Sequence, residues 1–176
     1  CILWVDEIDK AFINGQKSND SGTTSRVLGT FINWLSEKKS NVFIIATANN
    51  FSLLPLELIR KGRFDEIFFV GLPTFTERKQ IFQVFLSRFR PKTKIIFDFQ
   101  KLSEKSSGFS CAEIEQAIIE AMHIGFNKKR EFRNVDILNA LEQIIPLSQV
   151  DSDSFKDLEN LALSGRIRLA SQNSAE

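Results

Sequence analysis

The sequence predicts an α/β fold in which the end of a parallel sheet is followed by a small helical domain. Two apolar runs of strand length, Ile2–Val5 and Val42–Ala48, each lead into polar residues, as buried parallel strands do at their carboxyl ends. After Gly71-Leu72-Pro73 the apolar residues recur only at helical spacing. These three residues therefore mark the predicted boundary between the two parts.

The composition limits the classes of function. With 176 residues, 43% of them hydrophobic, the chain can build a packed core. Its 23 basic and 22 acidic side chains give a net charge of +1, so no direct nucleic-acid partner is expected. Two isolated cysteines indicate a reducing compartment without structural zinc, so any metal would be held by oxygen. No apolar stretch is long enough for a membrane span.

The first half contains alternating strands and helices. After the first strand we expect a short helical turn, Asp9–Ile13, and then an exposed polar loop, Asn14–Thr24, rich in Gly, Ser and Asn. A helix is predicted over Ser25–Lys38. Its evidence is the helical spacing of five apolar residues, Val27, Leu28, Phe31, Ile32 and Leu35.

The second predicted strand, Val42–Ala48, ends in Thr47-Ala48-Asn49-Asn50 and so carries polar side chains to the same edge as the first. A helical turn, Pro55–Ile59, then leads through Arg60-Lys61-Gly62-Arg63 to a third strand, Glu66–Val70.

The second half is predicted to be helical throughout. One apolar stripe comprises Ile81, Phe82, Phe85, Leu86 and Phe89, and another Ile114, Ala117, Ile118, Ala121 and Met122. A further helix, Val135–Ile145, is stopped by Pro146. A polar linker and a weaker helix at about Ser154–Ser164 complete the chain.

The polar residues at the strand ends suit phosphoryl transfer to water. That reaction needs a cation on the phosphates, an oriented water and positive charge to stabilise the transition state. Asp6 would hold Mg²⁺, largely through water, and Glu7 would deprotonate the attacking water. Asn49 would contact the same water, and Arg60 and Arg63 would supply positive charge. Each alone has a plainer reading, as a strand end, a turn or helix-terminal charges.

Together, these residues resemble the AAA family of the AAA+ ATPases. Residues 45–50 and 53–65 are similar to that family's second region of homology. The resemblance implies that Asp6 and Glu7 form the Walker B pair and that Asn49 is the sensor that positions water. It also implies that Arg60 and Arg63 are arginine fingers reaching a neighbouring subunit's site in a ring, usually a hexamer, with ATP and Mg²⁺ as cofactors.

The helical half resembles the lid of the same family. Residues 107–115 are similar to its lid segment, in which a Gly-Ala pair at a helix start lies behind the ribose and adenine. Cys111 stands in the Gly position and Ala112 follows it, so both are implied nucleotide contacts. The expected organisation is the back half of the AAA+ α/β domain over 1–73, a helical lid over 74–145 and a polar tail over 146–176.

Within the family, residues 31–38, 58–73 and 112–122 are most similar to AAA proteins encoded in algal plastid genomes and found in cyanobacteria. This resemblance implies the chloroplast stroma, or the cytoplasm of a cyanobacterium. The expected function is ATP hydrolysis coupled to protein remodelling. No Gly-rich phosphate loop occurs in the 176 residues. We expect that loop upstream of Cys1 in the gene; the alternative is a truncated, non-catalytic subunit that lacks it.

Overall fold

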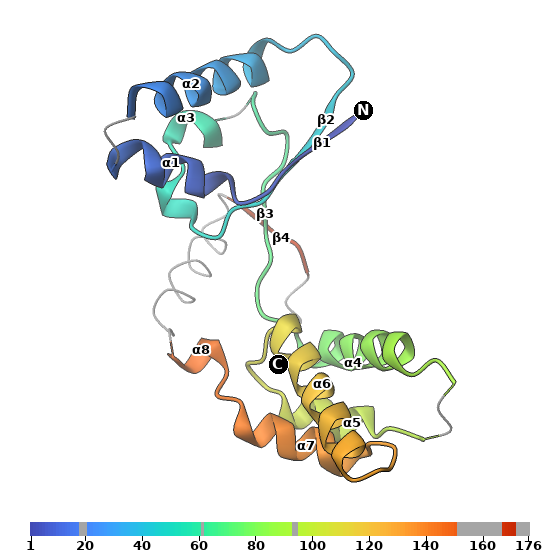
Figure 1. Cartoon of the computed structure of the whole chain (residues 1–176). Coiled ribbons are helices and arrows are strands. Elements are labelled where there is room, and N and C mark those ends of the chain that lie inside the picture. Colours follow the sequence, from blue (N-terminus) through green and yellow to red (C-terminus); the bar gives the residue numbers. More distant parts are fainter. Residues whose placement is uncertain (18–20, 61, 93–94, 151–166, 172–176) are drawn as a thin grey trace. The chain divides into compact units, whose positions relative to one another are not determined.

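The computed structural model describes the chain except for residues 18–20, 61, 93–94, 151–166 and 172–176. It divides into two compact units, Cys1–Ile67 and Phe68–Glu176, which Figure 1 shows with their helices and strands labelled. The predicted helix at Ser154–Ser164 lies outside the described residues. Among the helices that are described, none has the length and apolar character needed to cross a membrane.

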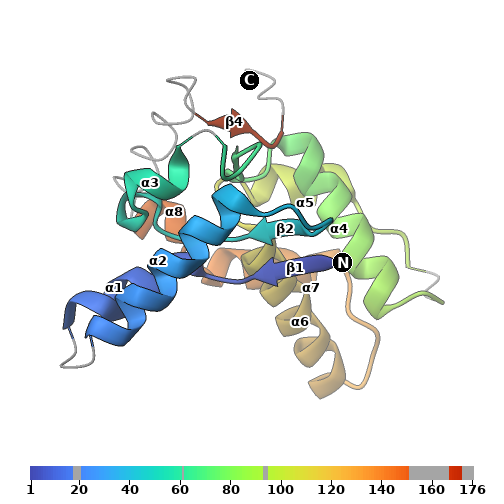
Figure 2. The ribbon, with the colours of Figure 1, turned by 90° about the horizontal axis from the view of Figure 1, so that it is seen from above.

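The first unit contains two parallel strands and the helices that accompany them. In chain order they are β1 Ile2–Val5, α1 Ile8–Lys17, α2 Ser21–Glu37, β2 Phe43–Ala46, the 3₁₀ turn η1 Phe51–Leu53 and α3 Leu56–Ile59. Ile2 pairs with Phe43 and Val5 with Ala46, so both strands run in one direction, as Figure 2 shows. The predicted parallel pairing is confirmed, and both carboxyl ends meet at one edge.

The two strands are buried on one face only, whereas the sequence predicts strands buried on both. Val5, Ile44 and Ala46 pack against a core of Ile8, Leu35 and Leu58. The alternate residues point to the other face, where in the described structure the side chains of Ile2, Trp4 and Phe43 are 61–70% exposed. The difference arises because the core residues come from α1, α2 and α3, which cover the first face.

The predicted loop Asn14–Thr24 is wrong in most of its length. Helix α1 continues to Lys17 and α2 begins at Ser21, so the connection between them is confined to residues 18–20, outside the described residues. The two helices pack along each other (Figure 1). Tertiary packing of this kind overrides the weak helix propensity of Gly, Ser and Asn, on which the loop prediction relied.

The second unit consists of a helical core and a short strand pair. Its elements are β3 Phe68–Phe69, α4 Phe75–Phe89, α5 Phe99–Lys105, α6 Cys111–Asn127, α7 Asn134–Gln143, α8 Leu147–Val150 and β4 Arg168–Leu169. The third predicted strand, Glu66–Val70, shrinks to β3, whose parallel partner is β4. The sequence did not indicate β4, because two residues are too few to establish a periodicity.

Both predicted apolar stripes of the helical part face its core. Phe82 and Leu86 of α4 and Ile114, Ile118 and Ala121 of α6 are buried there, at 0–3% exposure. Two capping boxes define where these helices begin, with Thr74 and Glu77 at α4 and Ser110 and Glu113 at α6. The helix starts are therefore fixed by local hydrogen bonds as well as by packing.

The connection between α6 and α7 is held by an ion pair between the half-buried Arg130 and the buried Asp136. The guanidinium of Arg130 donates two hydrogen bonds, of 2.7 and 2.8 Å, to the Asp136 carboxylate, whose side chain is 1% exposed. The backbone N–H of Arg133 donates a third, of 2.8 Å. Chiefly because of the hydrogen bonds from Arg130, the pKa of Asp136 is lowered from the ordinary value of 3.8, despite its burial.

Replacing Asp136 by Asn is expected to destabilise the second unit by about 2–3 kcal/mol, because it leaves Arg130 without its counter-ion. Urea unfolding of this variant and of Glu131→Gln, an exposed control on the same connection, would measure the difference. The unfolded carboxyl binds protons more readily than the folded one, so Asp136 stabilises at neutral pH. The stability lost by Asp136→Asn should shrink as the pH falls below 3.8. A pH-independent difference would contradict this account.

Candidate functional site

The carboxyl ends of β1 and β2 place Asp6 beside Thr47. The parallel ladder continues beyond both strands, since the N–H of Thr47 donates to the Val5 carbonyl and that of Ile8 to the Thr47 carbonyl, each at 2.9 Å. The Thr47 hydroxyl in turn donates to Asp6 Oδ1. The position of Asp6 beside Thr47 therefore follows directly from the register of the two strands.

Glu7 lies at a backbone turn. Its φ of 50° is in the left-handed region, so the chain leaves the extended strand there and enters α1. The Glu7 N–H donates to Thr47 Oγ1 at 2.9 Å, which ties the turn to β2. Successive strand residues point to opposite faces, and this turn is where the alternation ends. Asp6 and Glu7 can therefore both serve one edge of the sheet.

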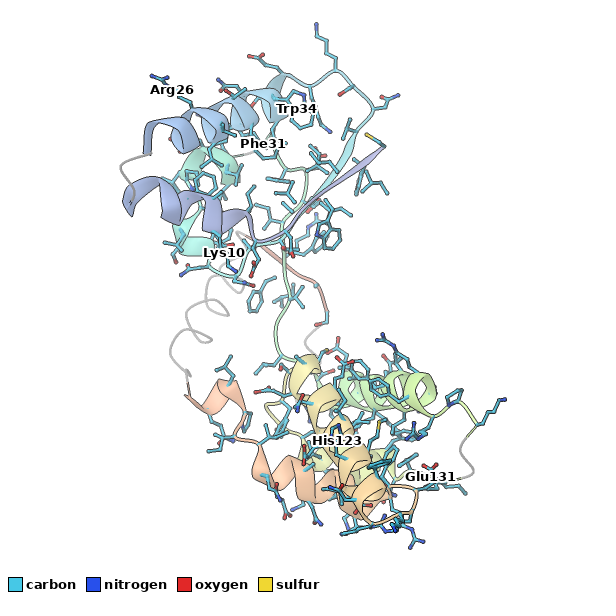
Figure 3. All side chains as sticks on the ribbon, in the orientation of Figure 1. Lys10, Arg26, Phe31, Trp34, His123 and Glu131 are labelled. Carbon is cyan, nitrogen blue, oxygen red and sulfur yellow. The ribbon has the colours of Figure 1, made fainter. Side chains whose placement is uncertain are left out.

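Asn49 reaches Glu7 from the end of β2. Its Nδ2 donates to Glu7 Oε1 at 3.0 Å, which joins two of the residues that the sequence singles out. The other carboxylate oxygen of Glu7, Oε2, pairs with Lys10 Nζ at 2.5 Å. Lys10, labelled in Figure 3, is exposed at the start of α1, and its hydrogen bond to Glu7 raises the pKa of its ammonium.

Asp9 also lies at this edge, although the sequence predicts it only as part of a helical turn. Its side chain is 3% exposed, and its two oxygens accept the N–H groups of Asn49, at 3.3 Å, and of Asn50, at 3.1 Å. A buried carboxylate thus fixes the backbone that carries Asn49. A signal was present: Asp9 lies between Ile8 and Phe12, which belong to the apolar core.

The donors at Asp6 suit Mg²⁺. Asp6 is exposed, and of its two oxygens it is Oδ1 that accepts from Thr47. Within the described parts of the chain, no group of three or more His, Cys, Asp and Glu could hold a metal. A site with one carboxylate fits Mg²⁺, which keeps several waters and takes one or two carboxylates. It would not suit zinc, which requires three or four protein ligands.

Arg60 and Arg63 belong to the same unit but have different surroundings. Arg60 is exposed at the end of α3, and Gly62 follows with a φ of 98°. Arg63 is half-buried, and its Nε donates to Ser36 Oγ on α2 at 3.0 Å. Its Nη1 is buried without a hydrogen-bond partner among the described residues. Arg60 is thus exposed to solvent, whereas Arg63 is bound to α2.

Cys111 and Ala112 lie in the second unit, as the first two residues of α6. Both are exposed. Partial burial of the thiol and the nearby charge of Glu77 raise the pKa of Cys111, so it stays protonated at neutral pH. Their side chains form the exposed surface at the start of this helix.

Comparison with known proteins identifies the class. The family model described as "ATPase family associated with various cellular activities (AAA)" matches residues 1–72. The fold resembles the crystal structure of the FIGL-1 AAA domain in complex with ADP, with a TM-score of 0.73 and 17% sequence identity. The match covers 93% of this chain and 57% of that one. Residues 1–72 therefore match the AAA family, and the chain has the predicted AAA+ α/β fold.

Several proteins of known sequence are similar to most of this chain. An "Uncharacterized AAA domain-containing protein ycf46" from Guillardia theta is 58% identical over 171 residues, 97% of this chain and 34% of that protein. Its namesake from Trieres chinensis is 57% identical over the same lengths. A proteasome-activating nucleotidase from Sulfurisphaera tokodaii is 35% identical over 81% of this chain and 37% of its own length. The chain thus spans about a third of the length of these relatives.

Proposed function

We propose that this chain is the part of an AAA ATPase that triggers ATP hydrolysis, and that the whole protein couples hydrolysis to the remodelling of a protein partner. The observation that carries the proposal is the 3.0 Å hydrogen bond from Asn49 to Glu7 beside Asp6. It joins an acid and an amide from two parallel strands at the edge where α/β proteins bind ligands.

The chemistry assigns a different task to each residue. When bound, Mg²⁺ would neutralise phosphate charge, and Asp6 would hold it through water. Glu7 accepts the proton of the attacking water, and Asn49 holds the Glu7 carboxylate in place. Lys10 pairs with the other carboxylate oxygen of Glu7, Oε2, and so holds that side of the carboxylate as well.

Two further parts of the proposal concern the assembly and its location. Arg60 and Arg63 would act on the nucleotide of the neighbouring subunit in a ring, which we expect to be a homo-hexamer. The exposure of Arg60 supports this, and Arg63 would first have to leave Ser36. Cys111 and Ala112 would line the adenosine in the lid. We place the protein in the plastid, in keeping with the resemblance to plastid-encoded AAA proteins.

The complete gene product is expected to hydrolyse ATP in the presence of Mg²⁺. An assay of phosphate release, together with binding of a fluorescent ADP analogue, tests this directly. Asp6→Asn should raise the Mg²⁺ concentration needed for half-maximal turnover, because one carboxylate charge is lost. The proposal would be overturned if the complete gene product neither bound nor hydrolysed nucleotide. Partner binding without nucleotide turnover would favour the non-catalytic alternative.

Replacing Asp9 by Asn is expected to lower the turnover number at saturating ATP by roughly 10–10²-fold, with KM little changed. The amide can accept only one of the two backbone hydrogen bonds, so Asn49 loses its fixed position. Steady-state kinetics measures the effect on turnover, and urea unfolding measures any separate loss of stability. A loss of stability without any change in turnover would reduce Asp9 to a structural residue.

A further inference from the structure

Glu113 forms a second cluster of hydrogen bonds, in the helical unit. Its Oε2 accepts hydrogen bonds from the backbone N–H and the hydroxyl of Ser110, both at 2.7 Å, which caps the start of α6. The cap requires only one of the two carboxylate oxygens. The other oxygen of Glu113 is directed to a segment far along the chain.

That segment is the start of α8. Glu113 Oε1 accepts the N–H of Leu147 at 2.7 Å. The next residue, Ser148, donates its hydroxyl to the carbonyl of Gly108, also at 2.7 Å. Two successive residues of α8 are therefore bound to the two sides of the turn that precedes α6. We call these two hydrogen bonds the α8 clasp.

Gly108 shows how close this approach is. Its φ is +79°, a conformation that favours glycine, and a Cβ at this position would lie 3.0 Å from the Ser148 hydroxyl. The turn thus combines an unusual backbone with contact from α8. Displacement of α8 would leave the Gly108 carbonyl and one Glu113 oxygen without these partners.

The clasp is charge-assisted. Burial of the Glu113 carboxylate opposes its ionisation, but hydrogen bonds from Ser110 and Leu147 outweigh this and lower the pKa of Glu113. Glu113 is therefore a carboxylate at neutral pH, and hydrogen bonds to an ionised acceptor are stronger than neutral ones. One of the two hydrogen bonds of the α8 clasp, that from Leu147, is therefore charge-assisted, and it ends on a side chain two residues after Cys111.

We infer that Glu113 is a positioning residue for the nucleotide: by tying α8 to the start of α6, it fixes the position of the Cys111–Ala112 surface. The inference rests on the proposed function, in which that surface lines the adenosine. With α8 bound, the start of α6 is held at Gly108, before the helix, and at Glu113, in its first turn. Because coupling between two binding events is reciprocal, bound ADP should also hold α8 more firmly.

The test uses the complete gene product and a fluorescent ADP analogue. Ser148→Ala removes the bond to Gly108 and leaves the α6 cap intact, and should weaken ADP binding by roughly 5-fold, the worth of about one hydrogen bond. Glu113→Gln removes the charge and should have a larger effect. Glu115→Gln is the matched control, since Glu115 lies on the same helix and contacts Arg88 instead.

Hydrogen exchange at the Leu147 amide provides a readout that a merely structural role would not alter. ADP should slow this exchange in the unmodified protein, and the slowing should be lost in Ser148→Ala. If the unmodified protein binds ADP but the variants bind it equally well, the inference about Glu113 is overturned and the proposed function stands. The same holds if ADP binds but leaves Leu147 exchange unchanged. If the unmodified protein does not bind ADP, the proposed function fails as well.

Discussion

Replacing Glu7 by Gln is expected to leave nucleotide binding intact and to lower turnover by roughly 10²–10⁴-fold, as for a lost general base. Gln has the same shape, and its side-chain oxygen can still accept the hydrogen bond from Asn49. It cannot take a proton from water at neutral pH. Phosphate release measured at saturating ATP, beside a binding assay, would separate the two effects.

Glu57→Gln serves as the control for this experiment. Glu57 is an exposed acid on α3 in the same unit, so its replacement removes one charge without touching the strand ends. Its turnover should match that of the unmodified protein. Full activity in Glu7→Gln would remove Glu7 from the mechanism and leave Asp6 and Asn49 without a base.

Under the proposed function, replacing Arg60 or Arg63 by Ala is expected to lower hydrolysis by up to about 10³–10⁵-fold, the range known for arginine fingers. The structure predicts different effects of the two substitutions on stability. Loss of Arg60 should leave stability unchanged because its side chain is exposed, whereas loss of Arg63 also removes its hydrogen bond to Ser36. Arg26→Ala, at an exposed cation on α2 (Figure 3), is the matched control.

An experiment that mixes two inactive variants, Glu7→Gln and Arg60→Ala, tests whether the hydrolysis site is shared between subunits. Glu7→Gln chains retain both arginines, and Arg60→Ala chains retain the carboxylate. In mixed rings some sites combine an intact Glu7 with an intact neighbouring Arg60, so part of the activity should return. Phosphate release measured across a series of mixing ratios gives the result. No recovery at any ratio would exclude arginines acting between subunits.

The sequence predicted the parts of this fold that carry a strong local signal. The two apolar strand runs and the stripes of α4 and α6 have periodicities that packing later reinforces. The sequence also predicted that polar side chains from both strand ends share one edge, and the structure joins two of them, Glu7 and Asn49, by a hydrogen bond. These predictions depended on spacing, which a single sequence displays.

Other features depend on contacts between distant residues. The predicted loop Asn14–Thr24 was wrong because α1 and α2 pack along each other. Asp9 and Thr47 gain importance only from a hydrogen-bond network between β1, α1 and β2. The two-residue strand β4 is far from its partner β3 in sequence. No local pattern encodes such pairings.

The left-handed backbone of Glu7 has a consequence for the evolution of this segment. An L-residue with a long side chain in that conformation costs about 1–2 kcal/mol, which Gly would avoid and Asn would reduce. The backbone conformation would therefore favour Gly or Asn at position 7, whereas the contacts with Asn49 and Lys10 and the proposed chemistry favour a carboxylate. A version of this chain selected for stability without regard to activity would therefore be expected to replace Glu7 early.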